Sequence, residues 1–173
     1  MAKFVFDMDG TLNVFEPIGP DELAKPGFMK NRQPFDNLLD AARILHEDGH
    51  EIWIASAVMP YEHVISDKNY WLDQHMPYIP KERRIFIPYG QSKYDALHTF
   101  MQESDVFVDD YSDNLHGLVR RFTPGSSWIC VKCINGINDT NHSWNGARIS
   151  VWTKGQIIAD TLKGLSYFGQ KSA

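Results

Sequence analysis

Two aspartates near the N-terminus, Asp7 and Asp9, follow the largely apolar run Lys3–Phe6. The run predicts a short buried strand, and Gly10 gives the backbone the freedom to turn sharply after it. Because ligands of open α/β sheets bind beyond the carboxyl ends of the strands, carboxylates at such an end lie where a site is expected. One of the two could attack phosphorus while the other transfers a proton.

Carboxylates this close repel each other unless a cation lies between them. Mg²⁺ suits the position, because it binds through one or two carboxylates and keeps water and phosphate oxygens as its other ligands. The alternative is that Asp7 and Asp9 only cap a turn, as aspartate often does. Because short motifs also occur by chance, the hypothesis needs support from elsewhere in the chain.

The composition is that of a globular chain of 173 residues, 43% hydrophobic and 13% aromatic, which fits one domain spanning 1–173. A formal net charge of −5 argues against binding to a nucleic-acid duplex, whose phosphates need a basic surface. No run approaches the ~18 apolar residues of a membrane span, and acids interrupt the apolar start that a signal peptide needs. We therefore expect a cytoplasmic protein that does not contact a membrane.

Five apolar, β-branched or aromatic runs alternate with helical patterns, which predicts an α/β fold with a parallel sheet. The runs are Lys3–Phe6, Glu51–Ala55, Arg84–Ile87, Val106–Val108 and Trp128–Val131. Helical patterns cover 34–47, 61–76, 92–102 and 157–165, with residues 66–68 as a candidate break in the second.

Residues 13–33 form a polar insert that contains glycine and proline. Compact domains seldom carry such a loop without a use, and covering an active site is a common one. The alternative is an excursion over the surface.

Further polar residues stand at the ends of the predicted elements. Ser56 follows the second run, and Lys93 begins a predicted helix, where a cation is mildly unfavourable unless it has a role or reaches solvent. Asp109 and Asp110 end the fourth run, where adjacent acids are costly without a cation. Each signal is weak alone, but the set could converge with the first acid pair at one edge of the sheet.

This ordered set resembles the four motifs of the haloacid dehalogenase-like phosphohydrolase superfamily, which match Asp7-Met8-Asp9-Gly10-Thr11, Ser56, Lys93 and Asp109-Asp110. Within it, Phe15 and the segments 25–31 and 107–115 are similar to the cytosolic 5′(3′)-deoxyribonucleotidase family and its bacterial and phage relatives. Residues 135–141 are similar to a segment of the bacterial members. The resemblance implies a Rossmann-like three-layer sandwich with a mostly parallel sheet in the order 5-4-1-2-3 and a small cap at about 13–33.

The resemblance also implies a Mg²⁺-dependent phosphomonoesterase acting on a small molecule, a deoxyribonucleoside monophosphate, and it allows a homodimer. Asp7 would be the nucleophile and Asp9 the general acid and base. Mg²⁺ would be held by Asp7, by the backbone carbonyl of Asp9 and by Asp109, with Asp110 acting through water or from outside the first ring of ligands.

Phosphate binding would fall to Ser56, Lys93, Gly10 and Thr11, and the base would stack on Phe15, with Phe28 as a second candidate. Both phenylalanines could instead pack the insert against the core. The insert is shorter than the helical cap of the animal enzymes, which would leave the site more open.

Two other functions remain open. The same chemistry could act on a sugar phosphate, a phosphoprotein or a nucleic-acid end, or the chain could be a non-catalytic module that binds a phosphorylated ligand. Cys130 and Cys133 form a C-x-x-C, but no second pair at zinc-ligand spacing follows, so we interpret them as structural thiols of a buried strand. Arg120 and Arg121 complement a helix dipole and need no partner.

Overall fold

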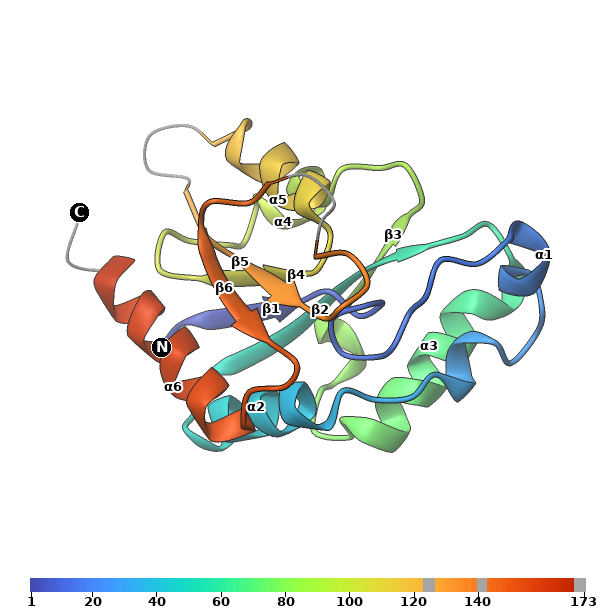
Figure 1. The fold of residues 1–173 in the computed structure, drawn as a ribbon, viewed down its shortest axis with the longest axis horizontal. Coiled ribbons are helices and arrows are strands. Elements are labelled where there is room, and N and C mark those ends of the chain that lie inside the picture. The colour runs from blue at the N-terminus through green and yellow to red at the C-terminus, as the bar shows by residue number, and fades with distance from the viewer. Residues whose placement is uncertain (123–126, 140–142, 170–173) are drawn as a thin grey trace.

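Six parallel strands form one sheet in the order β3-β2-β1-β4-β5-β6 in the computed structural model, which describes residues 1–122, 127–139 and 143–169 (Figure 1). The strands are β1 (Lys3–Phe6), β2 (Glu51–Val58), β3 (Arg84–Pro88), β4 (Val106–Asp109), β5 (Ile129–Ile134) and β6 (Ala147–Ser150). Parallel pairing directs all the carboxyl ends to one edge.

Helices cover both faces of the sheet, which makes three layers (Figure 1). One face packs against α2 (Asp36–Glu47), α3 (Glu62–His75) and α6 (Gly155–Gly169), and the other against α4 (Lys93–Leu97) and α5 (Ser112–Val119). Side chains alternate between faces along a strand, so Phe4 and Phe6 enter the first core and Val5 the second. Among the described residues, no helix is long and apolar enough to span a bilayer.

The predicted strand order is confirmed, and β6 extends the sheet by one strand that the sequence analysis missed. β6 has the sequence Ala-Arg-Ile-Ser with one buried residue, so it presents no apolar run. Helix α3 runs without the break considered at residues 66–68, and α4 ends at Leu97 instead of reaching residue 102. Strand β2 continues to Val58, so Ser56 lies inside a strand and not after its end.

The insert of residues 13–33 contains two short helices, α1 (Pro20–Leu23) and η1 (Met29–Asn31), and α3 lies beside it (Figure 1). A third short helix, η2 (Lys81–Arg83), precedes β3. Two hydrogen bonds attach the insert to α3: the Gly27 N–H donates to Asp67 Oδ2 at 2.7 Å, and Trp71 Nε1–H donates to the Arg32 carbonyl at 2.7 Å. The insert is thereby fixed beside the carboxyl edge of the sheet.

Candidate active site

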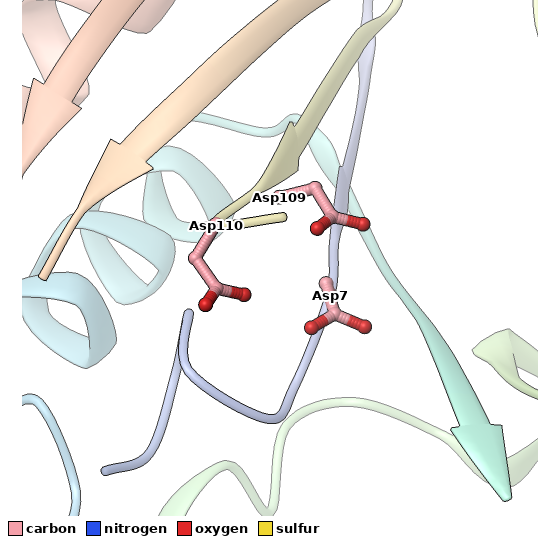
Figure 2. A group of neighbouring side chains, drawn as sticks. All are labelled: Asp7, Asp109 and Asp110. Atoms are coloured by element: carbon pink, nitrogen blue, oxygen red, sulfur yellow. The ribbon is translucent and has the colours of Figure 1, made fainter. Parts of the chain in front are cut away.

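Three buried carboxylates meet where the adjacent strands β1 and β4 end (Figure 2). Asp7 follows β1 and stays in register, because its N–H donates to the Val108 carbonyl at 2.8 Å. Asp109 is the last residue of β4, and Asp110 follows it. Ligand oxygens of the three lie within 4.8 Å of one another, so two segments that are far apart in sequence build one acidic centre.

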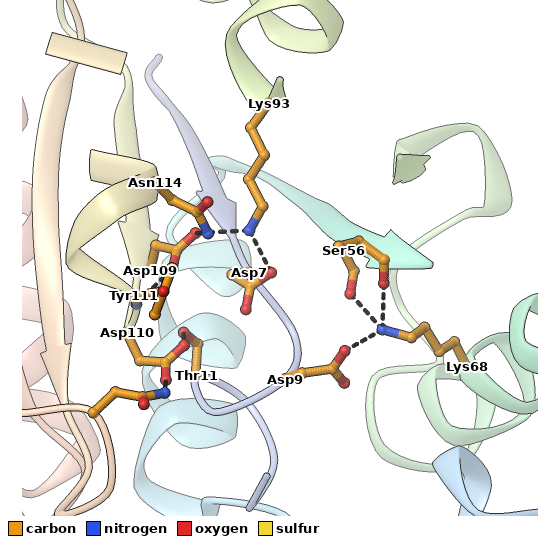
Figure 3. Close-up of polar contacts among 12 residues, drawn as sticks. Asp7, Asp9, Thr11, Ser56, Lys68, Lys93, Asp109, Asp110, Tyr111 and Asn114 are labelled. Carbon is orange, nitrogen blue, oxygen red and sulfur yellow. Dashed lines mark hydrogen bonds and ion pairs between the residues drawn. The ribbon is translucent and has the colours of Figure 1, made fainter. Parts of the chain in front are cut away.

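Lys93, the first residue of α4, lies against this centre (Figure 3). Its ammonium donates to Asp7 Oδ1 and to Asp109 Oδ2, both at 2.6 Å. Asp109 also accepts from the Tyr111 N–H at 2.8 Å and from Asn114 Nδ2 at 3.0 Å. Burial lowers the pKa of Lys93, but the charges of Asp109 and Asp7 outweigh it and raise that pKa overall, so Lys93 is a fixed cation.

Asp110 packs against the turn that follows β1. Gly10 has φ +83°, and a Cβ there would lie 2.3 Å from Asp110 Oδ2, so only glycine fits. Asn135 Nδ2 donates to the Gly10 carbonyl at 2.7 Å and to Asp110 Oδ2 at 3.0 Å, and Asn138 Nδ2 donates to the same Oδ2 at 2.6 Å. The Thr11 hydroxyl lies 3.4 Å from Asp110 Oδ1. The turn and the second acid pair therefore hold each other in place.

The electrostatics of the centre fit a divalent cation. Burial raises the pKa of Asp7 well above its ordinary value, with Lys93 opposing and Asp109 adding to the rise. Burial, followed by the charge of Asp109, raises the pKa of Asp110 to about 6. Lys93 offsets one negative charge of three, and carboxylate oxygens are the ligands that Mg²⁺ prefers. The donor set of Asp7, Asp109 and Asp110 is thus suited to Mg²⁺.

The Asp9 carboxylate does not join the other three and points to Lys68 of α3 (Figure 3). Lys68 is 1% exposed, and its ammonium donates to Asp9 Oδ2, to Ser56 Oγ at 2.7 Å and to the Ala57 carbonyl at 2.9 Å. The predicted roles of Asp9 as a metal ligand through its backbone carbonyl and of Asp110 as an outer group remain predictions.

A cavity of about 430 Å³ opens above these residues and is lined by Asp7, Asp9, Lys68, Lys93, Asp109 and Asp110. Its remaining wall is mainly apolar. The insert contributes Phe15, Pro17, Ile18, Leu23 and Met29, and other segments contribute Ala57, Met59, Val64, Tyr89, Tyr111, Asn114 and Asn138. Phe28 does not line it: its ring meets Phe15 edge to face at 6.5 Å, and the Arg32 guanidinium lies 4.0 Å from its centroid.

Sequence reasoning missed Lys68, Asn135 and Asn138 as site residues. A signal for Lys68 was present, because the buried positions of α3 are Val64, Asp67, Lys68, Trp71 and Leu72, the spacing of an apolar helix face. A charge on such a face needs a buried partner. The two asparagines lie in the segment 135–141 singled out by resemblance, of which residues 140 and 141 fall outside the described part of the chain.

Solved structures with a similar fold include two phosphatases and one domain of an effector protein. The D,D-heptose 1,7-bisphosphate phosphatase of B. bronchiseptica, complexed with magnesium and phosphate, matches with a TM-score of 0.64 and 11% identity over 100% of both chains. The D,D-heptose 1,7-bisphosphate phosphatase of Burkholderia thailandensis matches with a TM-score of 0.57 and 12% identity, over 99% of this chain and 97% of that chain. The HAD domain of the Legionella pneumophila effector Lem4, an inactive mutant, matches with a TM-score of 0.53 and 15% identity, over 99% of this chain and 97% of that chain. These likenesses show the haloacid dehalogenase-like fold.

Among sequences, residues 21–162 match the family model described as 5′ nucleotidase, deoxy (Pyrimidine), cytosolic type C protein. The matched range contains Ser56, Lys93, Asp109 and Asp110 and begins after the first acid pair. The search of curated proteins found no match.

Proposed function

Because the chain belongs to the family of 5′ nucleotidase, deoxy (Pyrimidine), cytosolic type C proteins, we propose that it is a Mg²⁺-dependent phosphomonoesterase that hydrolyses deoxyribonucleoside monophosphates. The observation that carries the proposal is the buried cluster of Asp7, Asp109 and Asp110, with Lys93, on the floor of a cavity whose wall is mainly apolar. The floor suits an anion held through a metal, and the wall suits a flat apolar group.

In the proposed reaction, an Asp7 oxygen attacks phosphorus and the bond from phosphorus to the ester oxygen breaks. Asp9 gives its proton to the leaving alkoxide, then takes a proton from the water that attacks the aspartyl-phosphate, and this attack releases phosphate and restores Asp7. Mg²⁺, when bound by Asp7, Asp109 and the neighbouring oxygens, supplies positive charge that offsets the repulsion between nucleophile and phosphate.

The chain's own cation at the nucleophile is Lys93, which restrains Asp7 and can pair with a phosphoryl oxygen at the same place. Ser56 is fully buried beside Lys68, the Thr11 hydroxyl lies toward Asp110, and neither is among the residues that line the cavity. Their roles in phosphate binding, with that of Gly10, are part of the proposal.

The apolar wall favours a nucleotide over a sugar phosphate. A sugar offers hydroxyls that need polar partners, whereas Phe15, Ile18, Leu23 and Met29 offer apolar and aromatic contact. Stacking of a base on an aromatic side chain contributes about 1–3 kcal/mol and tolerates any base. We propose that Phe15 contacts the base and that Phe28 supports the ring of Phe15 from outside the cavity.

The test is phosphate release from 5′- and 3′-deoxyribonucleotides, ribonucleotides, sugar phosphates and an aryl phosphate, with Mg²⁺ and with chelator. We expect Mg²⁺-dependent turnover that favours deoxyribonucleotides and is lost in Asp7→Asn, a nearly isosteric variant that lacks the attacking charge. Release only from other esters would remove the nucleotide assignment. No release, with phosphate bound but not turned over, would indicate a binding module.

The same assay tests the base contact with a matched pair of variants. Phe15→Ala should raise KM for nucleotides by roughly 5-fold to 100-fold, the equivalent of a stacking contact, with a smaller effect on an aryl phosphate. Phe28→Ala, outside the cavity, should change KM much less. Equal effects of Phe15→Ala on both kinds of ester would show that this ring only packs the insert.

A further inference from the structure

Lys68 is a buried lysine at the site for which neither the sequence motifs nor the proposed reaction gives a role. Its ammonium has three N–H groups, and three acceptors surround it. Two of them are Asp9 Oδ2 and Ser56 Oγ (Figure 3), and the third is the Ala57 carbonyl. Lys68 lines the cavity, yet with all three donors engaged it has none left for a phosphate oxygen. Its place therefore differs from that of Lys93, which contacts the nucleophile.

These contacts join three elements at one nitrogen atom. Lys68 comes from α3, Ser56 and Ala57 from the carboxyl end of β2, and Asp9 from the turn after β1. Burying a lysine is costly unless its charge is paired and its hydrogen bonds are satisfied, and here both conditions hold. An arrangement of this kind restricts the Asp9 side chain to one orientation.

The two oxygens of Asp9 are in different situations. Oδ2 accepts from Lys68, whereas Oδ1 is buried and has no hydrogen-bond partner among the described residues. Asp9 also lines the cavity that contains Asp7. Lys68 thus fixes one oxygen and leaves the other without a partner in the described part of the chain. In the same way, Ser56 Oγ accepts from Lys68, so the proton of its hydroxyl must be donated elsewhere.

We propose that Lys68 is a positioning residue that holds Asp9 so that its second oxygen meets the leaving oxygen of the substrate. The inference rests on the proposed phosphomonoesterase function. It assigns Lys68 to proton transfer at the leaving group, and leaves nucleophilic attack to Asp7 and Lys93. The effect of changing Lys68 can therefore be distinguished from the effect of changing Lys93 by comparing substrates with different leaving groups.

The experiment compares Lys68→Met on two esters: the alkyl phosphate that the wild-type enzyme hydrolyses best, and 2,4-dinitrophenyl phosphate. An alkoxide needs a proton to leave, whereas dinitrophenolate does not. Positioned proton transfer contributes about 100-fold to 10,000-fold, so we expect Lys68→Met to reduce kcat for the alkyl ester at least ~10-fold more than for the aryl ester. Lys93→Met should reduce both by similar factors.

A double-mutant cycle then tests whether Lys68 acts through Asp9. With Asp9→Asn already present, adding Lys68→Met should change kcat for the alkyl ester less than about 3-fold, because residues that act as a unit are not additive. Lys163→Met is the matched control, a surface lysine on α6 that pairs with Asp48 at 2.6 Å, and it should alter neither ester. Thermal melting of each variant reports on folding.

Equal losses on both esters, or additive losses in the cycle, would overturn the inference and leave the proposed function standing. Wild-type turnover of alkyl esters other than nucleotides would overturn only the nucleotide assignment, since the comparison uses the best alkyl ester of any kind. A wild-type enzyme that hydrolyses no alkyl ester would contradict both, because Asp9 would then have no leaving group to protonate.

Discussion

At the scale of single residues, the site depends on how closely the backbone approaches the carboxylates as much as on charge. Gly10 is the clearest example, because its backbone lies against the Asp110 carboxylate and its φ is positive. Asn135, which follows β5, links the same turn to Asp110, because its Nδ2 donates to both the Gly10 carbonyl and Asp110 Oδ2. The position of one carboxylate therefore depends on a residue without a side chain.

Gly10→Ala should destabilise the protein and weaken Mg²⁺ binding. The positive φ costs about 1–2 kcal/mol for alanine, and the added Cβ would also displace Asp110. Gly49→Ala is the matched control, since Gly49 has φ +86° with nothing within 4 Å of the added atom. Thermal melts with and without Mg²⁺ should show a similar backbone cost in both variants and a lost Mg²⁺ response in Gly10→Ala alone. An intact Mg²⁺ response there would argue against Asp110 as part of the metal site.

At the scale of elements, β5 shows how a strand separates residues that look like a motif. Cys130 packs in the core beneath α4 and α5, whereas Cys133 packs in the core beneath α2, α3 and α6. Because the two side chains lie on opposite faces of the sheet, they cannot ligate one ion or form a disulfide without rearrangement. Both are free and buried, which confirms their interpretation as structural thiols.

The two thiols should react slowly with a disulfide reagent in the native protein and rapidly in denaturant. Burial raises the pKa of Cys130 to about 12 and that of Cys133 well above its ordinary value, so neither forms the reactive thiolate at neutral pH. Absorbance of the released thiol follows the reaction. Fast stoichiometric labelling of the native state, or a zinc ion that survives purification with chelator, would contradict this account.

Helix α3 connects the insert to the site at the same scale. Two adjacent residues of this helix contact different parts of the protein. Asp67 accepts a hydrogen bond from the Gly27 N–H of the insert, and Lys68 forms an ion pair with Asp9. The wall of the cavity and the acid on its floor are therefore placed by one helix.

At the scale of the whole molecule, the fold gathers three carboxylates into an interior that supplies one ammonium directly to two of them. Such a cluster stabilises the protonated acids in the absence of metal. The raised pKa of Asp110 contributes stability that is present below its usual value of 3.8 and is lost as the pH rises through about 6. Without metal, the protein should therefore lose stability from this cluster between pH 5 and pH 7.5.

Mg²⁺ should reverse that loss, because it replaces the protons. A ligand at about 100 times its Kd stabilises by roughly 2.7 kcal/mol, a shift of about 5–10 °C in Tm for a chain of this size. We expect such a shift at pH 7.5 and a much smaller one at pH 5, where protons compete for the same oxygens. Melting curves at both pH values, with Mg²⁺ and with chelator, measure it. A larger shift at pH 5 would contradict the carboxylate cluster as the binding site.

The sequence by itself determined the class of fold, the strand order implied by resemblance and the acids at the strand ends. Apolar runs and the motifs that contain Asp7 and Asp109 are local signals, because each consists of consecutive residues. The same local reading missed β6, because an edge strand with one buried side chain has no apolar run. It also placed Ser56 beyond a strand that in fact continues to Val58.

Only the tertiary structure decided which groups meet. Lys68 reaches Asp9 across 59 positions of sequence, and Asn135 reaches Gly10 across 125, and no local pattern encodes these distances. The reason is physical, because a charged side chain can be buried only if an oppositely charged or hydrogen-bonding partner lies beside it. The packing of α3 against β2, and the pairing of β4 with both β1 and β5, bring these partners together. Sequence specified the reactive groups, and packing assigned each of them its neighbour.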